Sequence, residues 1–359
     1  MWYIVFFLIT SSYFFILSKA KFSSPYEKVL ILIPLCFSLS FLPSWQMGVA
    51  TDYESYVNVF SNELALGLYE RKGEYLFVWL VSFLKYLDLP PQSLFVAISL
   101  IQTILLINVF RLLNNKEYNI VLLFILFYTM TNMLHAQMNI LRAYVAVYCF
   151  LNAFFYRLFN KKTLSILFLL FGFYWHKSIL LVSPFIFLPE KIYIFIFKHR
   201  VKLFFSFFVV YFSGIITKTL LIIVESAIPH YAHYITNQYG DIQVSFKNIL
   251  SKLIYLPLGL IFLYSIKRKD HEYKNRDKVI ISFWVVTNSL YLMLMHFYPI
   301  SRIIHYTIFF IIVPVYYLLT RNYISSVFKA LIILYCILPY LYKVLTADDN
   351  IFSYFPYFL

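Results

Sequence analysis

Several ionisable side chains stand beside strongly apolar stretches, where they could bind or process an anionic group. The stretch FYWHKSILL, residues 173–181, places His176 and Lys177 side by side, and MNILRAYVAV carries Arg142. YPISRIIHY adds Arg302 and His305. Guanidinium groups bind phosphates through paired hydrogen bonds, and histidine titrates near neutral pH. These residue types favour a cationic site for a diphosphate, although interfacial anchoring would explain each of them alone.

Acidic and aromatic residues gather in one polar segment of the chain, QMGVATDYESYVNVFSNELALGLYERKGEYLF. Asp52, Tyr53 and Tyr56 lie near its start, and Glu74 lies near its end. Carboxylates and aromatic rings commonly contact the hydroxyls and ring faces of sugars. A solvated acidic loop with interfacial tyrosines is the alternative interpretation.

Several familiar chemistries have no motif in this chain. Its seven glycines form no phosphate-binding loop, and H-E-x-x-H, paired C-x-x-C and G-x-S-x-G are missing from the sequence. Asp52 and Glu54 are weak evidence for a metal site, and the three cysteines lie in apolar runs. We therefore expect no metal and no cofactor.

The composition is that of a membrane protein. Of the 359 residues, 62% are hydrophobic and 13% are charged. Repeated apolar stretches are long enough to cross a hydrocarbon core of about 30 Å. We predict an all-α polytopic integral membrane protein of about twelve transmembrane helices. The predicted spans are 2–17, 29–45, 93–112, 119–134, 140–158, 163–175, 178–197, 203–223, 248–266, 279–296, 303–319 and 326–345.

Charge fixes the predicted orientation of these spans. Segment 75–88 is short for a span, and treating it as an interfacial or re-entrant helix leaves the basic clusters inside and the acidic loops outside. The net charge of +14 then reflects basic cytoplasmic loops such as 267–278, so we expect the lipid bilayer and no nucleic acid as partner. We predict one transmembrane domain, 1–359, with external loops 46–92 and 224–247 and both termini outside.

This orientation brings the ionisable side chains to the outer membrane boundary. Arg142 lies just inside the outer end of its helix, and Arg302 and His176 lie at the outer ends of two others. Charges there avoid most of the cost of about 2.5–3.5 kcal/mol for a charge at the bilayer centre. Anchoring arginines belong preferentially on the cytoplasmic side, so two outer arginines favour a cationic pocket.

The order of these motifs resembles the EpsG-like branch of the Wzy-type polysaccharide polymerases. The family's D-Y-x-x-Y motif is matched by Asp52 to Tyr56, and a glutamate heading a short apolar helix is matched by Glu74. An arginine at the head of a mid-chain helix is matched by Arg142, where Ala143 replaces a frequent glutamine. The F-x-H-x-S motif is matched by 174–178, including Lys177 and Ser178, and a late arginine by Arg302.

The resemblance implies a GT-C-like membrane glycosyltransferase of the bacterial inner membrane, with its active site facing the periplasm or exterior. It would polymerise undecaprenyl-diphosphate-linked oligosaccharide repeat units into O-antigen, capsular or exopolysaccharide. Both donor and acceptor would be lipid-linked, and a flippase and a chain-length regulator are further implied partners.

Each singled-out residue receives a role under this hypothesis. Arg142 and Arg302 would stabilise the diphosphate leaving group, and His176 would activate the acceptor hydroxyl or bind phosphate. Asp52 is the alternative base. The residues expected to bind substrate are Tyr53, Tyr56, Glu74, Lys177, Ser178 and His305.

Other functions use related residues. A flippase or transporter for the same lipid-linked sugar would carry charges deeper in the membrane and often show internal repeats. A membrane O-acyltransferase modifying surface glycan would place its basic residues towards a cytoplasmic acyl donor. Ligation of finished glycan uses nearly the same chemistry as polymerisation.

Overall fold

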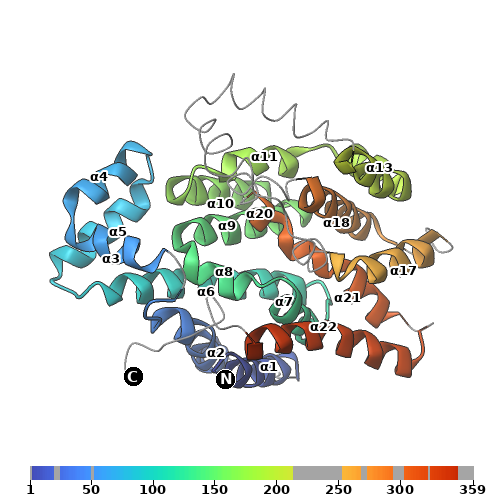
Figure 1. The fold of residues 1–359 in the computed structure, drawn as a ribbon, viewed down its shortest axis with the longest axis horizontal. Coiled ribbons are helices and arrows are strands. Elements are labelled where there is room, and N and C mark those ends of the chain that lie inside the picture. The colour runs from blue at the N-terminus through green and yellow to red at the C-terminus, as the bar shows by residue number, and fades with distance from the viewer. Residues whose placement is uncertain are drawn as a thin grey trace. The chain divides into compact units, whose positions relative to one another are not determined.

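The computed structural model describes residues 2–19, 25–49, 52–212, 253–267, 273–293, 303–321 and 324–346. Within these ranges the regular elements are helices and no strand occurs, which confirms the all-α prediction (Figure 1). The chain forms two compact units, Met1–Ile186 with Ile333–Leu359, and Phe187–Ile332. The assignment of 1–359 to a single transmembrane domain stays a prediction.

Three described helices are long and apolar enough to cross a membrane: α1 (Trp2–Lys19), α6 (Gln92–Asn114) and α22 (Ser326–Thr346). Two bent pairs raise the number to as many as five, again among the described residues. One pair is α7 (Ile120–Met130) with α8 (Met133–Asn139), bent by 54°, and the other is α11 (Ile179–Phe187) with α12 (Glu190–Lys198). The predicted count of about twelve spans is not confirmed.

Most of the remaining predicted spans correspond to a helix. These helices are α2 (Pro25–Ser44), α9 (Leu141–Leu158), α10 (Lys162–Trp175), α13 (Arg200–Phe212), α17 (Leu256–Lys267), α18 (Asn275–Met293), α20 (Ile304–Thr307), the 3₁₀ helix η3 (Ile308–Ile312) and α21 (Val313–Thr320). The predicted external loop 224–247 lies outside the described residues, as do parts of spans 203–223 and 248–266 and of loop 267–278.

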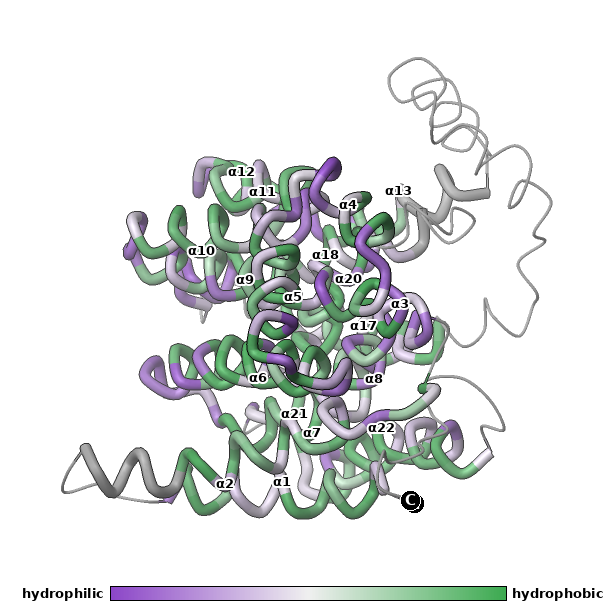
Figure 2. The backbone as a smooth tube through the Cα atoms, turned by 90° about the vertical axis from the view of Figure 1, so that its left-hand side faces the viewer, coloured by the Kyte–Doolittle hydropathy of each residue, from purple (hydrophilic) through white to green (hydrophobic). Residues whose placement is uncertain are grey.

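The predicted external segment folds into three short helices, α3 (Tyr53–Ser61), α4 (Glu63–Arg71) and α5 (Tyr75–Tyr86). Hydrophilic residues gather along α3 and α4, whereas α1 and α2 are largely hydrophobic (Figure 2). With 12 residues, α5 is about 18 Å long, well short of the hydrocarbon thickness. The separate helix α5 agrees with the prediction of a short helix over 75–88.

In the first unit, α9 packs against both α6 and α10 (Figure 1). Polar side chains join α9 to its neighbours: Asn152 donates to the Leu105 carbonyl at 2.9 Å, and Ser165 donates to the Ala153 carbonyl at 2.8 Å. Such hydrogen bonds hold apolar helices together where burial of apolar surface cannot discriminate protein from lipid. The α6–α9–α10 layer is therefore the scaffold on which Arg142 stands.

The second unit is organised around α18, which contacts α12, α13 and η3. Ser282 of α18 donates to the Tyr193 carbonyl of α12 at 2.7 Å, and Thr287 donates to the Thr307 carbonyl at 3.1 Å. Both hydroxyls are buried, so these bonds satisfy polar atoms that apolar surroundings would otherwise penalise.

Close approach of α9 and α10 requires a glycine at position 172. A Cβ added there would lie 2.7 Å from Ile179 Cδ1 and 2.9 Å from Cys149 Cβ. We expect Gly172→Ala to destabilise the protein by about 1–3 kcal/mol through overpacking, measured as a lower thermal unfolding midpoint in detergent. Gly67→Ala in α4 is the matched control, because nothing lies within 4 Å of its added Cβ. An unchanged midpoint for Gly172→Ala would contradict the packing argument.

Candidate active site

A tight turn between α4 and α5 positions Glu74 within the first unit so that its side chain is buried. Gly73 has a φ of +70°, a left-handed conformation that glycine adopts without a Cβ penalty. Its N–H donates to the Glu70 carbonyl at 2.7 Å, and the Glu74 N–H donates to the Tyr69 carbonyl at 3.1 Å. Glu74 stands at the N-cap of α5, yet its side chain makes no capping bond. The carboxylate is instead directed to partners on α9 and α10.

The Glu74 carboxylate joins two basic side chains from different helices. Its Oε2 accepts a hydrogen bond from the Arg142 guanidinium, and its Oε1 lies 2.6 Å from His176 Nδ1. The Glu74 side chain is only 3% exposed, compared with 16% for Arg142 and 24% for His176. Residues 74, 142 and 176 therefore form one cluster, in which the acid is buried and the two bases reach the surface.

Aromatic rings surround the Arg142 guanidinium. Its Cζ lies 4.2 Å from the centre of the Tyr69 ring and 5.6 Å from that of Phe77. Arg142 stands in the first turn of α9, where the helix dipole disfavours a cation, so Glu74 and the ring faces offset that cost. Its Nε is buried and has no hydrogen-bond partner in the part of the chain that the structure describes. The arginine thus retains a donor that its neighbours do not use.

His176 is placed by the end of α10. The helix stops at Trp175, and His176 is extended, with φ −161° and its N–H still donating to the Gly172 carbonyl. Burial alone would raise the pKa of Glu74, but the hydrogen bond from His176 and the positive charge of Arg142 hold that pKa below its ordinary value. An ionised carboxylate only accepts hydrogen bonds, so His176 Nδ1 carries the proton. In the neutral form of the ring, this tautomer leaves Nε2 as the proton acceptor.

Lys177 lies directly over the Gly73 turn. The end of the Lys177 side chain, Cε and Nζ, lies where a Cβ on residue 73 would be. The same Nζ lies 5.6 Å from the Phe173 ring centre. The structure therefore brings a second basic side chain to the cluster: Lys177 follows His176 in the chain and lies over Gly73, the residue before Glu74.

The segment that begins at Asp52 is joined to the chain just before Arg142. The Asp52 N–H donates to Asn139 Oδ1 at 3.1 Å, which joins the D-Y-x-x-Y motif to the turn preceding Arg142. Tyr53 stacks on Phe95 with ring centres 4.9 Å apart. Tyr56 is buried. Burial raises the pKa of the Tyr56 hydroxyl. The Arg142 charge acts to lower this pKa and the Asp52 charge acts to raise it, so both charges lie close enough to interact with Tyr56.

Not every predicted site residue joins this cluster. Ser178 lies in the turn between α10 and α11. His305 lies in α20, in the second unit, and Arg302 lies outside the described residues. Glu74, predicted to bind substrate, is more buried than Arg142 and His176, so these two side chains lie closer to the surface than its carboxylate does.

Two contributors were not singled out from the sequence. Tyr69 is one of 33 tyrosines and no motif marks it, yet it stacks on Arg142. Asn139 stands three residues before Arg142, and its amide, placed where a helix is about to start, was the available signal. Among the described residues no group of three or more His, Cys, Asp or Glu side chains could hold a metal ion.

Comparison with known proteins yields one family match. The model of the EpsG family matches residues 28–359, which confirms the resemblance drawn from the motifs. No curated protein and no solved structure matches the chain. The family supports a polysaccharide polymerase-like, glycosyltransferase-like role, and together with the apolar helices it supports a membrane protein of polysaccharide biosynthesis.

The burial of the Glu74 carboxylate leads to a prediction about the stability of the protein. Glu74→Gln should cost about 3 kcal/mol, because it leaves the Arg142 charge without its carboxylate. Since the folded-state pKa of Glu74 is lowered, its contribution is present above the ordinary glutamate pKa and lost as pH falls through the folded-state value. Thermal unfolding across an acidic pH series should show this loss in the wild type and a weaker one in Glu74→Gln.

Glu63→Gln is the control, because Glu63 pairs with Lys85 at 2.9 Å but its side chain is 85% exposed. Exposed pairs contribute little to stability, so its midpoint and pH profile should match the wild type. Equal behaviour of the two variants would show that Glu74 is not a buried partner of Arg142.

Proposed function

Because the chain belongs to the EpsG family, we propose that it is a membrane glycosyltransferase that polymerises undecaprenyl-diphosphate-linked oligosaccharide repeat units. The single observation that carries this proposal is the Glu74 carboxylate shared by Arg142 and His176. It holds a proton acceptor and a phosphate-binding group in one fixed cluster. These are the two functions that sugar transfer from a lipid diphosphate requires.

In the proposed reaction, the growing glycan on undecaprenyl diphosphate is the donor and the terminal sugar of a new lipid-linked repeat is the acceptor. The acceptor hydroxyl oxygen bonds to the anomeric carbon of the donor, and the bond from that carbon to the phosphate oxygen breaks. The hydroxyl proton passes to His176 Nε2, and the bonding electron pair leaves with undecaprenyl diphosphate. No oxidant, reductant or further co-reactant is needed.

Glu74 supports His176 as the general base. By accepting from Nδ1, the carboxylate holds the imidazole in the tautomer whose Nε2 can take a proton, and it stabilises the imidazolium that forms. Positioned bases of this kind contribute roughly 10²–10⁴ in rate. Asp52 is the second candidate for this role, because its segment meets the cluster through Asn139.

Arg142 supports departure of the diphosphate. Negative charge grows on the leaving group in the transition state, and a guanidinium fixed by Glu74 and Tyr69 needs no rearrangement to meet it. Lys177 adds a second cation at the same place. The roles predicted from the sequence for the remaining residues stay part of the proposal: stabilisation of the diphosphate by Arg302, and substrate binding by His305, Tyr53, Tyr56 and Ser178.

The proposed setting is the outer face of the bacterial inner membrane. Lipid-linked repeats would arrive there from a flippase, and a chain-length regulator would act on the product. The product is O-antigen, capsular or exopolysaccharide.

The proposal predicts the glycan length distribution of variant cells. In a deletion strain, His176→Ala and Arg142→Ala should each reduce polymerisation by roughly 10²–10³, leaving mainly single repeat units on the cell surface. Glycan length is read from gels of extracted surface glycan at matched protein levels. Arg157→Ala is the matched control, because it removes an arginine from the other end of α9. That variant should retain long chains.

Other outcomes point to other functions. Long chains lacking only a decoration would overturn the polymerase proposal in favour of an O-acyltransferase. Repeat units trapped on the cytoplasmic leaflet would overturn it in favour of a flippase, and free long chains that fail to reach a final acceptor would indicate a ligase.

A further inference from the structure

Basic residues are concentrated where helices of the second unit begin or end. The end of α12 adjoins the start of α13, the end of α17 precedes the start of α18, and Arg321 caps the end of α21. Segments 198–202 and 267–278, together with Arg321, contain ten basic and three acidic residues. Helix α18 contacts α12, α13 and α21, and α21 also contacts α17 (Figure 1). The ends of these helices therefore carry an excess of positive charge.

Two neighbouring aromatic rings bring three of these cations together. The ring centres of Phe197 and Tyr273 are 6.2 Å apart. Arg200 Cζ lies 4.4 Å from the Phe197 centre, and Lys278 Nζ lies 5.7 Å from it. Arg321 Cζ lies 4.4 Å from the Tyr273 centre. Cations at these distances are attracted by the ring faces, so the five residues form one group, the Tyr273 cluster.

One carboxylate lies beside this cluster. Tyr317 donates to Asp277 Oδ1 at 2.9 Å, and its ring centre lies 5.5 Å from that of Tyr273. Arg276 Nε lies 4.0 Å from the same oxygen. Asp277 carries one negative charge, whereas basic residues exceed acidic ones by a wide margin in these segments. This excess of charge favours an anion as the partner of the cluster.

The three cations of the cluster differ in exposure. Arg200 is 3% exposed, and its guanidinium donates to the Phe197 carbonyl at 2.7 Å, so it binds the end of α12. Lys278 and Arg321 are half-buried. Side chains that only anchor a helix extend their charge away from apolar surface, whereas these charges lie against aromatic rings. Arg200 therefore supports the cluster from inside, and Lys278 and Arg321 keep surface that a ligand can reach.

Apolar side chains are exposed next to the cluster. Val201 directly follows Arg200 and is 38% exposed, and Phe205 is 50% exposed. These two residues are four apart on α13, so they share one face of that helix. Phe195 of α12 is 58% exposed. A ligand that joins an anionic group to apolar chains can use both surfaces, whereas a small soluble anion can use only the cationic one.

We propose that the Tyr273 cluster binds the phosphate of an anionic phospholipid, with the acyl chains along Val201 and Phe205. Lys278 and Arg321 contact the phosphate, and the edge of the guanidinium donates to it while the face stays on Tyr273. Basic pockets between membrane helices bind lipid headgroups in this way. The inference agrees with the prediction that 267–278 is cytoplasmic, and it does not depend on the proposed glycosyltransferase activity.

A lipid titration followed by native mass spectrometry tests this site. The full-length protein in neutral detergent is titrated with phosphatidylglycerol or with phosphatidylcholine of the same acyl chains. Phosphatidylglycerol should bind its first site roughly ten-fold more tightly, because its phosphate is not offset by a choline charge. The double variant Lys278→Gln with Arg321→Gln should raise the Kd for phosphatidylglycerol by roughly ten-fold.

The matched control is Lys161→Gln with Lys162→Gln, which removes two exposed lysines of the first unit and should leave this Kd unchanged. Equal binding of the two lipids, or an equal loss of affinity in the cluster and control variants, would overturn the proposal, because general attraction to charged lipid would explain both. Displacement of phosphatidylglycerol by excess inorganic phosphate would also overturn it, in favour of a soluble anion.

Arg321→Lys separates recognition from folding. This variant keeps a cation beside Tyr273 but loses the planar guanidinium, so it should weaken phosphatidylglycerol binding while the thermal unfolding midpoint without lipid stays that of the wild type. Wild-type affinity in this variant would contradict phosphate binding by Arg321. His176→Ala should bind phosphatidylglycerol like the wild type, so a failure of the lipid site and a failure of the proposed function are distinguishable.

Discussion

A single buried carboxylate determines how this site is built. Glu74 is almost fully buried, so its charge must be matched by groups that approach it directly. Arg142 and His176 are those groups, and they come from the start of α9 and the end of α10. The carboxylate thereby fixes three segments that are far apart in the chain, and it does so at the places where two of their helices begin or end.

The surrounding structure follows from what this carboxylate needs. The left-handed turn at Gly73 directs Glu74 inward, and the end of the Lys177 side chain lies over the same turn. Close packing of α9 against α10 through Gly172 brings residues 142 and 176 to one carboxylate. Tyr69 covers the guanidinium, so the arginine is held by a carboxylate and by an aromatic ring.

Much of the fold could be predicted from apolar segments, because the length and hydropathy of a helix are local properties. Span 140–158 corresponds to α9 almost residue for residue, and 75–88 forms a separate short helix. Breaks within apolar segments were harder to predict. The segment 119–134 divides after Met130 into α7 and α8, and the composition of the segment does not record this bend. Arg142 and His176 could be singled out because ionisable residues are rare in such surroundings. The inward direction of Glu74 could not, since an acidic residue in a polar loop is ordinarily solvated.

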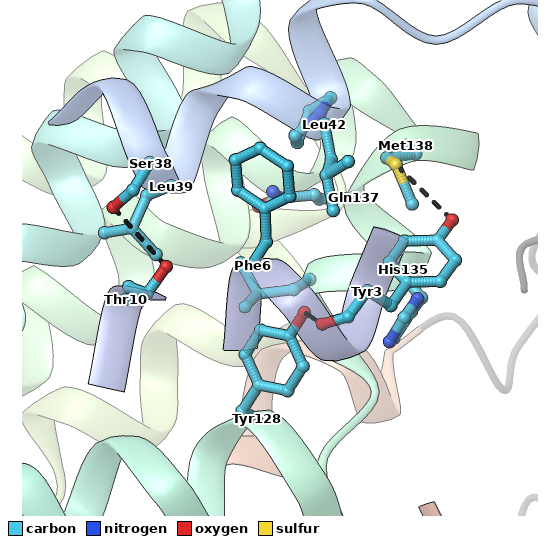
Figure 3. A pocket seen from close by; sticks show the side chains of 12 residues that line it. Tyr3, Phe6, Thr10, Ser38, Leu39, Leu42, Tyr128, His135, Gln137 and Met138 are labelled. Atoms are coloured by element: carbon cyan, nitrogen blue, oxygen red, sulfur yellow. Dashed lines mark hydrogen bonds between the residues drawn. The ribbon is translucent and has the colours of Figure 1, made fainter. Parts of the chain in front are cut away.

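The bend between α7 and α8 determines which neighbours α8 can contact. An unbroken helix through 120–139 would continue along the α7 axis, and its last turns could not both pack against Tyr3 and hold Asp52. The break at Asn132, in a left-handed conformation, turns α8 by 54°. One side of α8 then packs Met138 against Tyr3, while its end presents Asn139 to the Asp52 backbone. The bend therefore lets one seven-residue helix pack against the apolar α1 (Figure 3) and also join the Asp52 segment to the turn that leads into Arg142.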